Sequence, residues 1–256
     1  MSHGRMLAVG PAGAVGLLRQ NPVVYVLHAG PDAPAVDVFS GVELISGLGF
    51  GALSEGLQAP PGTYPLEVFP ARAGSERPAG DPAASASVTL EAGESYLVSA
   101  AGFLGGVGGA RQPLTLHVFT ADFANPEPNT ARVRVLHQSP DAPAVDVGTV
   151  TGLQMDTPPI FANIAYPGAS VPEGNALPAI PLRVGVAPAG NRVPLAIYEA
   201  EPQEGARVFA VAAGALSPRR GEEPFRTLLI LATPTPGISP WQVGEATPVS
   251  GSFAGP

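Results

Sequence analysis

The sequence predicts an all-β protein made of two similar domains in tandem, and three observations lead to this prediction. The phrase "LHAGPDAPAVDV" at residues 27–38 returns as "LHQSPDAPAVDV" at residues 136–147. Short apolar runs alternate with clusters of Gly and Pro, which number 32 and 31 in the chain. Proline inside a helix removes a hydrogen-bond donor and clashes with the preceding turn, so this punctuation excludes long helices. A length of 256 residues is enough for two domains with separate cores.

Each domain is predicted to consist of short strands separated by turns, as in a β-sandwich or barrel. In the first domain the strand candidates are residues 23–29, 35–39, 63–70, 85–90, 95–104 and 114–121. In the second domain they are residues 131–138, 144–150, 160–166, 180–187, 193–200, 206–216 and 225–234. Shorter phrases also correspond, such as "VSAAGFL" in the first domain and "AVAAGAL" in the second. A duplicated domain accounts for both levels of similarity.

The repeats place the domains at residues 22–125 and 130–234. The linker between them, "FANPEPNT" at residues 123–130, contains two prolines and is expected to be a fairly stiff hinge. The N-terminal segment, residues 1–21, includes "MLAVGPAGAVGLL". This stretch is either a secretory h-region or a strand-forming or disordered terminus, and it is too short to span a bilayer. Residues 235–256 form a C-terminal extension that either lies along the body or is a loose tail.

Charge and residue usage exclude several classes of function. The chain has 13 basic and 21 acidic residues and a net charge of −8, and it has no basic stripe that would bind nucleic acid. All the basic residues are Arg, so Schiff-base lysines and the phosphate-loop lysine are excluded. There is no Cys, and therefore no disulfide, thiol nucleophile or zinc–thiolate site. No transmembrane helix is expected.

The histidine of each repeated phrase is predicted to point into its domain. Val133, Val135 and His137 alternate with Arg132 and Arg134 along one strand candidate. Because alternate residues of a strand lie on opposite faces, and Arg marks the solvent face, His137 shares the inner face with the valines. His28 holds the corresponding position in the first domain. A buried imidazole needs hydrogen-bond partners.

The acidic residues of the same phrase are the expected partners of these rings. "PDAP" is typical of a tight turn, which brings the following "AVDV" back toward the first strand. Asp32 or Asp37 could then contact His28. In the second domain Asp141 or Asp146 could contact His137. We interpret these residues as structural His–Asp pins at the corner of each domain.

A metal or catalytic cluster is the alternative interpretation of the same residues. One His and two carboxylates can bind a divalent ion. The sequence offers neither a further ligand at fixed spacing nor a calcium-binding loop. Near Ser54, "ALSEG" is close to a nucleophile elbow, but no α/β pattern surrounds it. We therefore expect no catalytic residue, no metal and no cofactor.

The phrase "LHQSPDAPAVDV" resembles the hallmark of the domain-of-unknown-function family numbered 4397, L-H-x-S-P-D-A-P-x-V-D-V. The first copy departs from it at Gly30, where the hallmark has Ser. The resemblance covers roughly residues 21–234. It implies two tandem immunoglobulin-like antiparallel β-sandwich domains, usually of exported or surface proteins of bacteria and archaea. The family has no assigned activity, so no catalytic residue is carried over.

These observations favour a non-enzymatic, secreted or cell-surface structural or adhesive protein. One alternative is a module of the cell envelope that binds a carbohydrate or a small molecule. Another is a subunit of a strand-exchanged polymer, in which residues 6–18 or 238–253 pair with a neighbouring chain. A metal-dependent enzyme centred on His28 with Asp32 and Asp37 is a further alternative. The expected partners are other envelope proteins, glycans or a second copy of the chain.

Overall fold

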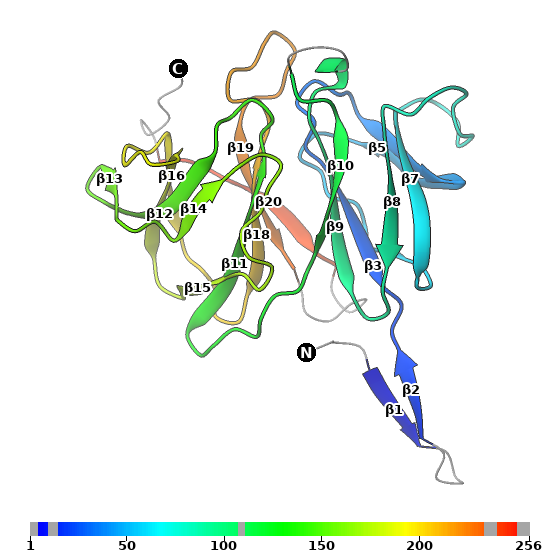
Figure 1. Cartoon of the computed structure of the whole chain (residues 1–256), viewed down its shortest axis with the longest axis horizontal. Helices are drawn as coiled ribbons and strands as arrows, with labels where there is room; N and C mark the ends of the chain where they lie inside the picture. The colour runs from blue at the N-terminus through cyan, green and yellow to red at the C-terminus, as the bar shows by residue number, and fades with distance from the viewer. Residues whose placement is uncertain (1–4, 10–14, 107–110, 233–239, 250–256) are drawn as a thin grey trace.

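The protein is all-β, as predicted, and its strands form two sandwiches and a separate hairpin (Figure 1). The computed structural model describes residues 5–9, 15–106, 111–232 and 240–249. Within these ranges the only helical element is the 3-10 turn η1 (Leu104–Gly106). No helical segment of the described chain is long and apolar enough to cross a bilayer.

The first sandwich consists of two four-stranded sheets, in the orders β5-β4-β7-β8 and β10-β9-β3-β6. Its strands are β3 (Val23–His28), β4 (Val36–Ser40), β5 (Val42–Leu48), β6 (Leu57–Gln58), β7 (Gly62–Pro70), β8 (Ala84–Leu90), β9 (Ser95–Ala101) and β10 (Thr115–Thr120). All six predicted strands are present. Strands β5 and β6 were not predicted.

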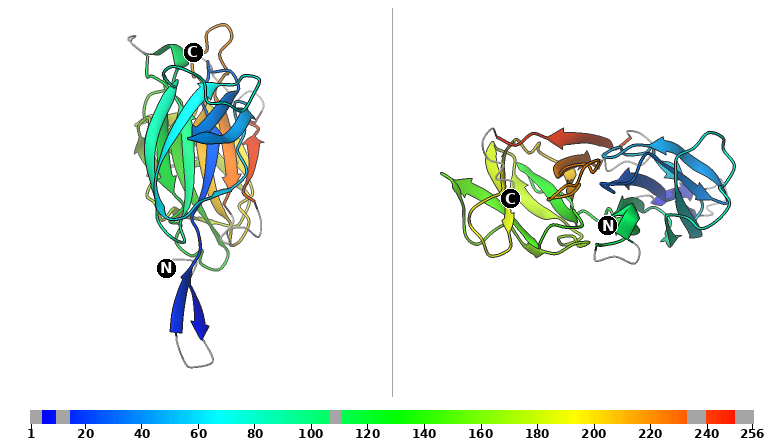
Figure 2. Two further views of the ribbon diagram at one scale, coloured as in Figure 1. Left: turned by 90° about the vertical axis from the view of Figure 1, so that its right-hand side faces the viewer. Right: turned by 90° about the horizontal axis from the view of Figure 1, so that it is seen from above.

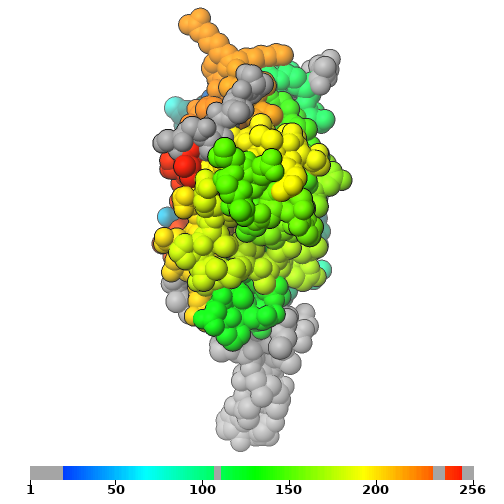
Figure 3. Space-filling model, turned by 90° about the vertical axis from the view of Figure 1, so that its left-hand side faces the viewer, coloured from blue at the N-terminus to red at the C-terminus, as the bar shows by residue number. Residues whose placement is uncertain are grey.

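The second sandwich consists of the sheets β15-β11-β18-β19-β20 and β13-β12-β16-β17, with β14 paired to β12. Its strands are β11 (Thr130–Gln138), β12 (Val145–Thr151), β13 (Gln154–Met155), β14 (Phe161–Ile164), β15 (Asn175–Pro178), β16 (Leu182–Pro188), β17 (Ala196–Ala200), β18 (Arg207–Ala213), β19 (Arg226–Leu231) and β20 (Gln242–Ala246). Figure 3 views this half of the molecule from its outer side.

The two sandwiches share one topology, and it includes a feature that the sequence did not predict. The first strand of each repeat pairs in parallel with the strand that carries the later "AAG" phrase: β3 with β9, and β11 with β18. The other strand pairs are antiparallel, as expected. Parallel strands that are covered on both faces have continuous apolar sequences. All six residues of β3, "VVYVLH", are buried.

The sandwiches pack against each other through their central sheets, β10-β9-β3-β6 and β15-β11-β18-β19-β20, and they lie side by side (Figure 2). Both sheets contribute side chains to one apolar cluster. Its buried members are Val23, Tyr25, Leu27, Ala29, Leu97, Ala101, Phe119, Phe123, Leu136, Phe209, Val211, Ala213, Leu228, Ile230, Ala232 and Trp241. Separate clusters fill the interior of each sandwich. The face of β11 that was predicted to meet solvent therefore meets the first sandwich.

Arg134 shows why that prediction was wrong. The residue is 6% exposed, and its Nη1 donates to the Thr120 carbonyl oxygen at 2.6 Å. Its guanidinium lies over the rings of Phe119 and Phe209, 5.7 and 5.9 Å from their centroids. Burial lowers the pKa of this guanidinium. An arginine with a long apolar stem and aromatic neighbours can occupy an interdomain surface as well as a solvent face.

The segments outside the repeats differ from one another in their contacts. The predicted hinge is attached to the second sandwich, because the Ala124 amide donates to the Glu173 carbonyl at 3.0 Å and the Phe123 ring meets Phe209 at 4.8 Å. The C-terminal extension lies along the body: β20 pairs with β19, and Trp241 stacks on Tyr25 of the first sandwich at 4.3 Å. The second sandwich thus extends beyond residue 234.

The N-terminal segment contains an antiparallel hairpin of β1 (Arg5–Val9) and β2 (Val15–Arg19). This hairpin pairs with none of the four large sheets, and it projects from the body near the start of β3 (Figures 1 and 2).

Candidate functional site

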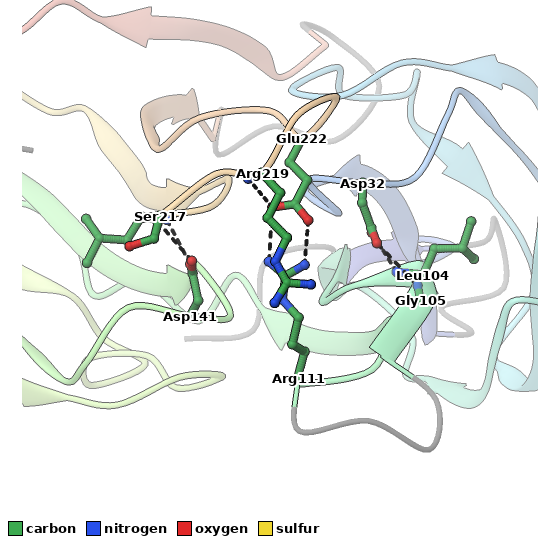
Figure 4. Close-up of polar contacts among 9 residues, drawn as sticks. Asp32, Leu104, Gly105, Arg111, Asp141, Ser217, Arg219 and Glu222 are labelled. Atoms are coloured by element: carbon green, nitrogen blue, oxygen red, sulfur yellow. Dashed lines mark hydrogen bonds and ion pairs between the residues drawn. The ribbon is translucent and has the colours of Figure 1, made fainter. Parts of the chain in front are cut away.

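The two "PDAP" turns lie at the same end of the molecule, beside the loops that follow β9 and β18 (Figure 4). Each turn follows the strand whose last residues include the predicted histidine. Here the two sandwiches also contact each other through loops. The six residues that the sequence singled out, or the turns beside them, therefore lie at this end of the molecule.

Both histidines are fully buried, at 0% exposure, as predicted from the strand alternation. The Nε2 of His28 lies 2.9 Å from the carbonyl oxygen of Pro34, and the Gly30 amide donates to Nδ1 at 3.2 Å. Because a carbonyl oxygen only accepts, the proton is on Nε2 and the ring is neutral. The second copy repeats both contacts, from His137 to Pro143 at 2.9 Å and from Ser139 at 3.3 Å. Each ring thus ties the end of a strand to the last residue of its turn.

The first aspartate of each phrase binds the loop that follows the "AAG" strand. The Oδ1 of Asp32 accepts from the amide of Leu104 at 2.6 Å, and its Oδ2 accepts from that of Gly105 at 3.2 Å. In the second copy, Asp141 accepts from the amides of Leu216 and Ser217 at 2.7 and 3.0 Å. Each carboxylate therefore connects the turn to a segment far along the chain rather than to its own downstream backbone.

The second aspartate of each phrase connects a neighbouring strand of the outer sheet, β5 or β14, to a loop. Asp37 is fully buried, and it accepts from the amides of Gly47 at 2.7 Å and Arg72 at 3.1 Å. In the second copy the corresponding residues are Asp146, Asn163 and Gly190, with distances of 2.6 and 2.8 Å. Gly47 and Asn163 both have a positive φ, of 66° and 51°, which turns their amides toward the carboxylate. Non-glycine residues rarely adopt this conformation, but Asn tolerates it.

The predicted His–Asp pins are wrong in their partners. Both nitrogens of each ring are bonded to backbone groups, and each carboxylate accepts two backbone amides. The physical reason is that the turn carries the Pro34 and Pro143 carbonyls, not a carboxylate, to the buried face of the ring. The four aspartates lie outside the ring contacts and anchor loops and neighbouring strands instead.

The sequence missed two further elements of this arrangement. Ser54 Oγ accepts from the Val26 amide at 2.9 Å, and Ser170 Oγ accepts from the Val135 amide at the same distance. The Ser54 side chain thus hydrogen-bonds the backbone of β3, the strand that carries His28. Gly102 and Gly214, in the two "AAG" phrases, have φ of 109° and 86°. A Cβ at either would lie 2.1 or 2.2 Å from a proline carbonyl oxygen of the opposite segment.

An ion pair joins the two sandwiches beside the turns (Figure 4). Arg111 of the first sandwich bonds Glu222 of the second through both nitrogens, at 2.5 and 3.0 Å, and it lies 3.2 Å over the Phe103 ring centroid. The Arg111 hydrogen bonds lower the pKa of the Glu222 carboxyl. Beside them, the amide of Glu223 donates to the Pro31 carbonyl at 2.7 Å. Glu222 belongs to the loop between β18 and β19, which projects at one end of the molecule in Figure 3. The loop that contains Arg111 and the loop that contains Glu222 differ in sequence, so comparison of the two repeats could not reveal this ion pair.

The chemistry of the site follows from these contacts. Burial lowers the pKa of His28 and His137, so both rings are neutral near pH 7. A general base needs a free nitrogen lone pair, and both Nδ1 lone pairs are occupied by amide donors. In the described part of the chain, no three His, Asp or Glu side chains gather as a metal site would require. The arrangement is suited to fixing backbone segments.

Residues 22–148 match the family described as domain of unknown function (DUF4397), and the first sandwich belongs to this family. The matched stretch runs from the start of the first sandwich to the end of the second hallmark phrase. The equivalence of the second sandwich is visible in its topology and in its repeated hydrogen bonds. No curated protein matches the chain.

Proposed function

We propose that the protein is a rigid, non-enzymatic structural or adhesive module of the cell surface or the secreted space. One observation carries the proposal: the apolar cluster between the two central sheets, which is made by both sandwiches. Obligate interfaces resemble a domain core in their apolar character, whereas mobile domains meet through smaller, more polar surfaces. The stacked Tyr25 and Trp241, at 4.3 Å, further connect the first sandwich to the C-terminal strand.

The contacts around the hallmark phrases support the same role. The histidine and both aspartates of each phrase hold backbone segments. The ion pair between Arg111 and Glu222 fixes the sandwiches at one end. A body of this kind would present its end loops at a constant spacing. The secreted or surface location is proposed from the exported character of the family.

The test of rigidity is backbone relaxation by NMR or small-angle scattering of the full chain. We expect both sandwiches to tumble as a single particle. Leu228→Asp, on the face of β19 that meets the first sandwich, should separate them, because Leu228 is only 4% exposed. Leu229→Asp, next along β19 and 41% exposed, is the matched control and should leave the tumbling unchanged. Independent tumbling in the unmodified chain would refute the rigid module. Antibody labelling of intact cells tests the surface location.

A second candidate, a strand-exchanged polymer, is favoured by the β1–β2 hairpin. A two-stranded hairpin is marginally stable by itself, and its outer edges have unpaired backbone groups that can pair with another chain. This hairpin pairs with no other described strand. Light scattering of the full chain and of a chain lacking residues 1–21 distinguishes the two candidates. A monomer in both cases contradicts the polymer.

The carbohydrate-binding alternative receives less support. Sugars are commonly bound by stacking on an exposed aromatic ring, and Trp241 is the single Trp of the chain. Its side chain is buried at 6% exposure between Tyr25 and Phe209.

A further inference from the structure

A cavity of about 210 Å³ lies inside the first sandwich, between its two sheets. Its walls include Val24, Val26, Leu44, Leu66 and Val88, which come from β3, β5, β7 and β8. Strands β8 and β10 lie together at one side of the sandwich. Strands β5 and β6 therefore form the opposite side, where Gln58 is exposed at the cavity wall.

The second sandwich fills the corresponding positions with larger side chains. The β6 and β15 ladders pair with equivalent residues of β3 and β11, and continuing the β6 ladder by one residue places Ala59 where Leu177 lies. The β8 and β17 ladders likewise place Ala86 where Tyr198 lies. Leu177 and Tyr198 are 5% and 7% exposed and belong to the core of the second sandwich. The copies therefore differ in side-chain size at two positions of the interior, one next to β6 and one on β8.

The size of the cavity is sufficient for a small molecule. An engineered cavity of about 150 Å³ with aliphatic and aromatic walls binds benzene, whereas a single water needs about 10–15 Å³. A void near Pro143 in the second sandwich has only about 10 Å³. The cavity of the first sandwich is therefore large enough for a small organic molecule, whereas the void in the second sandwich is not.

The walls also define the chemistry of the occupant. Among the residues that the structure describes, no charged side chain lines the cavity, and the polar side chains at its wall are Ser40, Gln58 and Tyr64. The Tyr64 hydroxyl donates to the Pro60 carbonyl at 2.9 Å. The side chains of Ser40 and Gln58 have no hydrogen-bond partner within the described ranges, so they can bind a neutral polar group of an occupant. Burying a charged group here would be costly because nothing compensates it.

We propose that this cavity binds a small, uncharged amphiphile: a short alkyl chain that ends in a neutral group such as a hydroxyl. The chain lies between the sheets, and the neutral group meets Ser40 or Gln58. This binding site is separate from the rigid structural role and does not depend on it.

The test is calorimetric titration of the full chain with 1-butanol, 1-hexanol and 1-octanol. Affinity should rise about fourfold for each added methylene, since each one transfers a similar apolar area out of water. Octanoate, with the same chain length and a charged end, should bind at least tenfold more weakly than 1-octanol. An affinity that does not depend on chain length overturns the proposal. Equal binding of octanoate and 1-octanol overturns the assignment of a neutral end group.

Ala59→Leu introduces at the cavity wall the side chain that the second sandwich has at the equivalent position, Leu177. This substitution should weaken 1-octanol binding at least tenfold. Ala73→Leu, the same change at an exposed position, is the matched control and should bind as the unmodified chain does. If Ala59→Leu does not fold, methyl NMR of the unmodified chain decides instead. 1-Octanol should shift the methyls of Val24 and Val88 and leave those of Val145 and Val186 in place. Shifts in both sandwiches, or in neither, overturn the proposal.

Discussion

The two sandwiches of this chain preserve the same polar contacts and differ in their interiors. The ring-to-carbonyl bonds, the four carboxylate anchors and the serine contacts to the strands recur in both copies. By contrast, the interior of the first sandwich has Ala59 and Ala86 at the positions where that of the second has Leu177 and Tyr198. Contacts to backbone groups restrict which residue can occupy a position, because the geometry must suit one donor or acceptor. Apolar positions tolerate changes of volume more readily.

Loss of a hallmark histidine gives the largest expected effect. His28→Ala and His137→Ala each remove a buried ring and leave an amide and a carbonyl without their partners. Each should lower the free energy of unfolding by about 3–5 kcal/mol, the range for a large-to-small core change with unpaired polar groups. Denaturant unfolding measures both. Losses that differ by more than about 2 kcal/mol would mean that the copies do not use the ring in the same way.

Acidification tests whether the rings are neutral in the folded protein. Burial lowers the folded-state pKa of His28 and His137 below the ordinary value of 6.5. Between that lowered pKa and 6.5 the unfolded chain binds more protons, so stability is fully present above pH 6.5 and falls as the pH decreases. Each ring can contribute up to about 1.4 kcal/mol per pH unit. Unfolding free energies from pH 7.5 to 5 should show this decrease, and a profile that is flat or rises toward pH 5 contradicts it.

The contacts of the hallmark phrases show which parts of the structure the sequence could predict. The fold class and the repeat were readable because turn residues and apolar runs recur in order. The inward direction of His137 followed from its alternation with Arg132 and Arg134. The partners of the rings were not readable, because backbone carbonyls and amides occur at every residue and the sequence does not say which of them a turn will bring close.

The packing of the two domains was hidden for a different reason. Arg134 indicates a solvent face when the second domain is considered alone, yet the first domain covers this face, with Phe119 against the guanidinium. The contact of Arg111 with Glu222 joins loops that differ between the copies, so comparison of the repeats could not find it. The cavity depends on the summed volume of facing side chains, which requires the register of the strands.

The ion pair between the sandwiches is the next largest effect, and it joins the two copies rather than recurring in each of them. Arg111 and Glu222 have side-chain exposures of 21% and 8%, so the pair is partly screened by solvent. Arg111→Ala should cost about 1–3 kcal/mol, between the values for exposed and buried pairs. Arg111→Lys should recover only part of the loss, because Lys neither binds bidentately nor stacks on Phe103. Thermal unfolding of the three proteins measures this, and full recovery by Lys contradicts the bidentate contact.

The smallest effect concerns the fourth position of the hallmark phrase, where Gly30 of the first copy corresponds to Ser139 of the second. Ser139 Oγ donates to the Gly214 carbonyl at 2.7 Å, whereas Gly30 has no side chain to donate. Ser139→Ala should therefore cost about 1 kcal/mol. In Gly30→Ser, a Cβ would lie 2.8 Å from the Leu114 Cδ1 and 3.3 Å from the Gly102 carbonyl oxygen.

Leu114 ends in a flexible side chain, so it can move aside, and the new hydroxyl can then donate to Gly102. The gain from this bond and the cost of moving Leu114 are of similar size, and Gly30→Ser should change the free energy of unfolding by less than about 1 kcal/mol. Gly30→Ala is the control, since it adds the Cβ without the donor and should be the less stable of the two. If Ala and Ser are equally stable at position 30, the first copy does not have the corner geometry of the second, and the equivalence of the two corners fails at this residue.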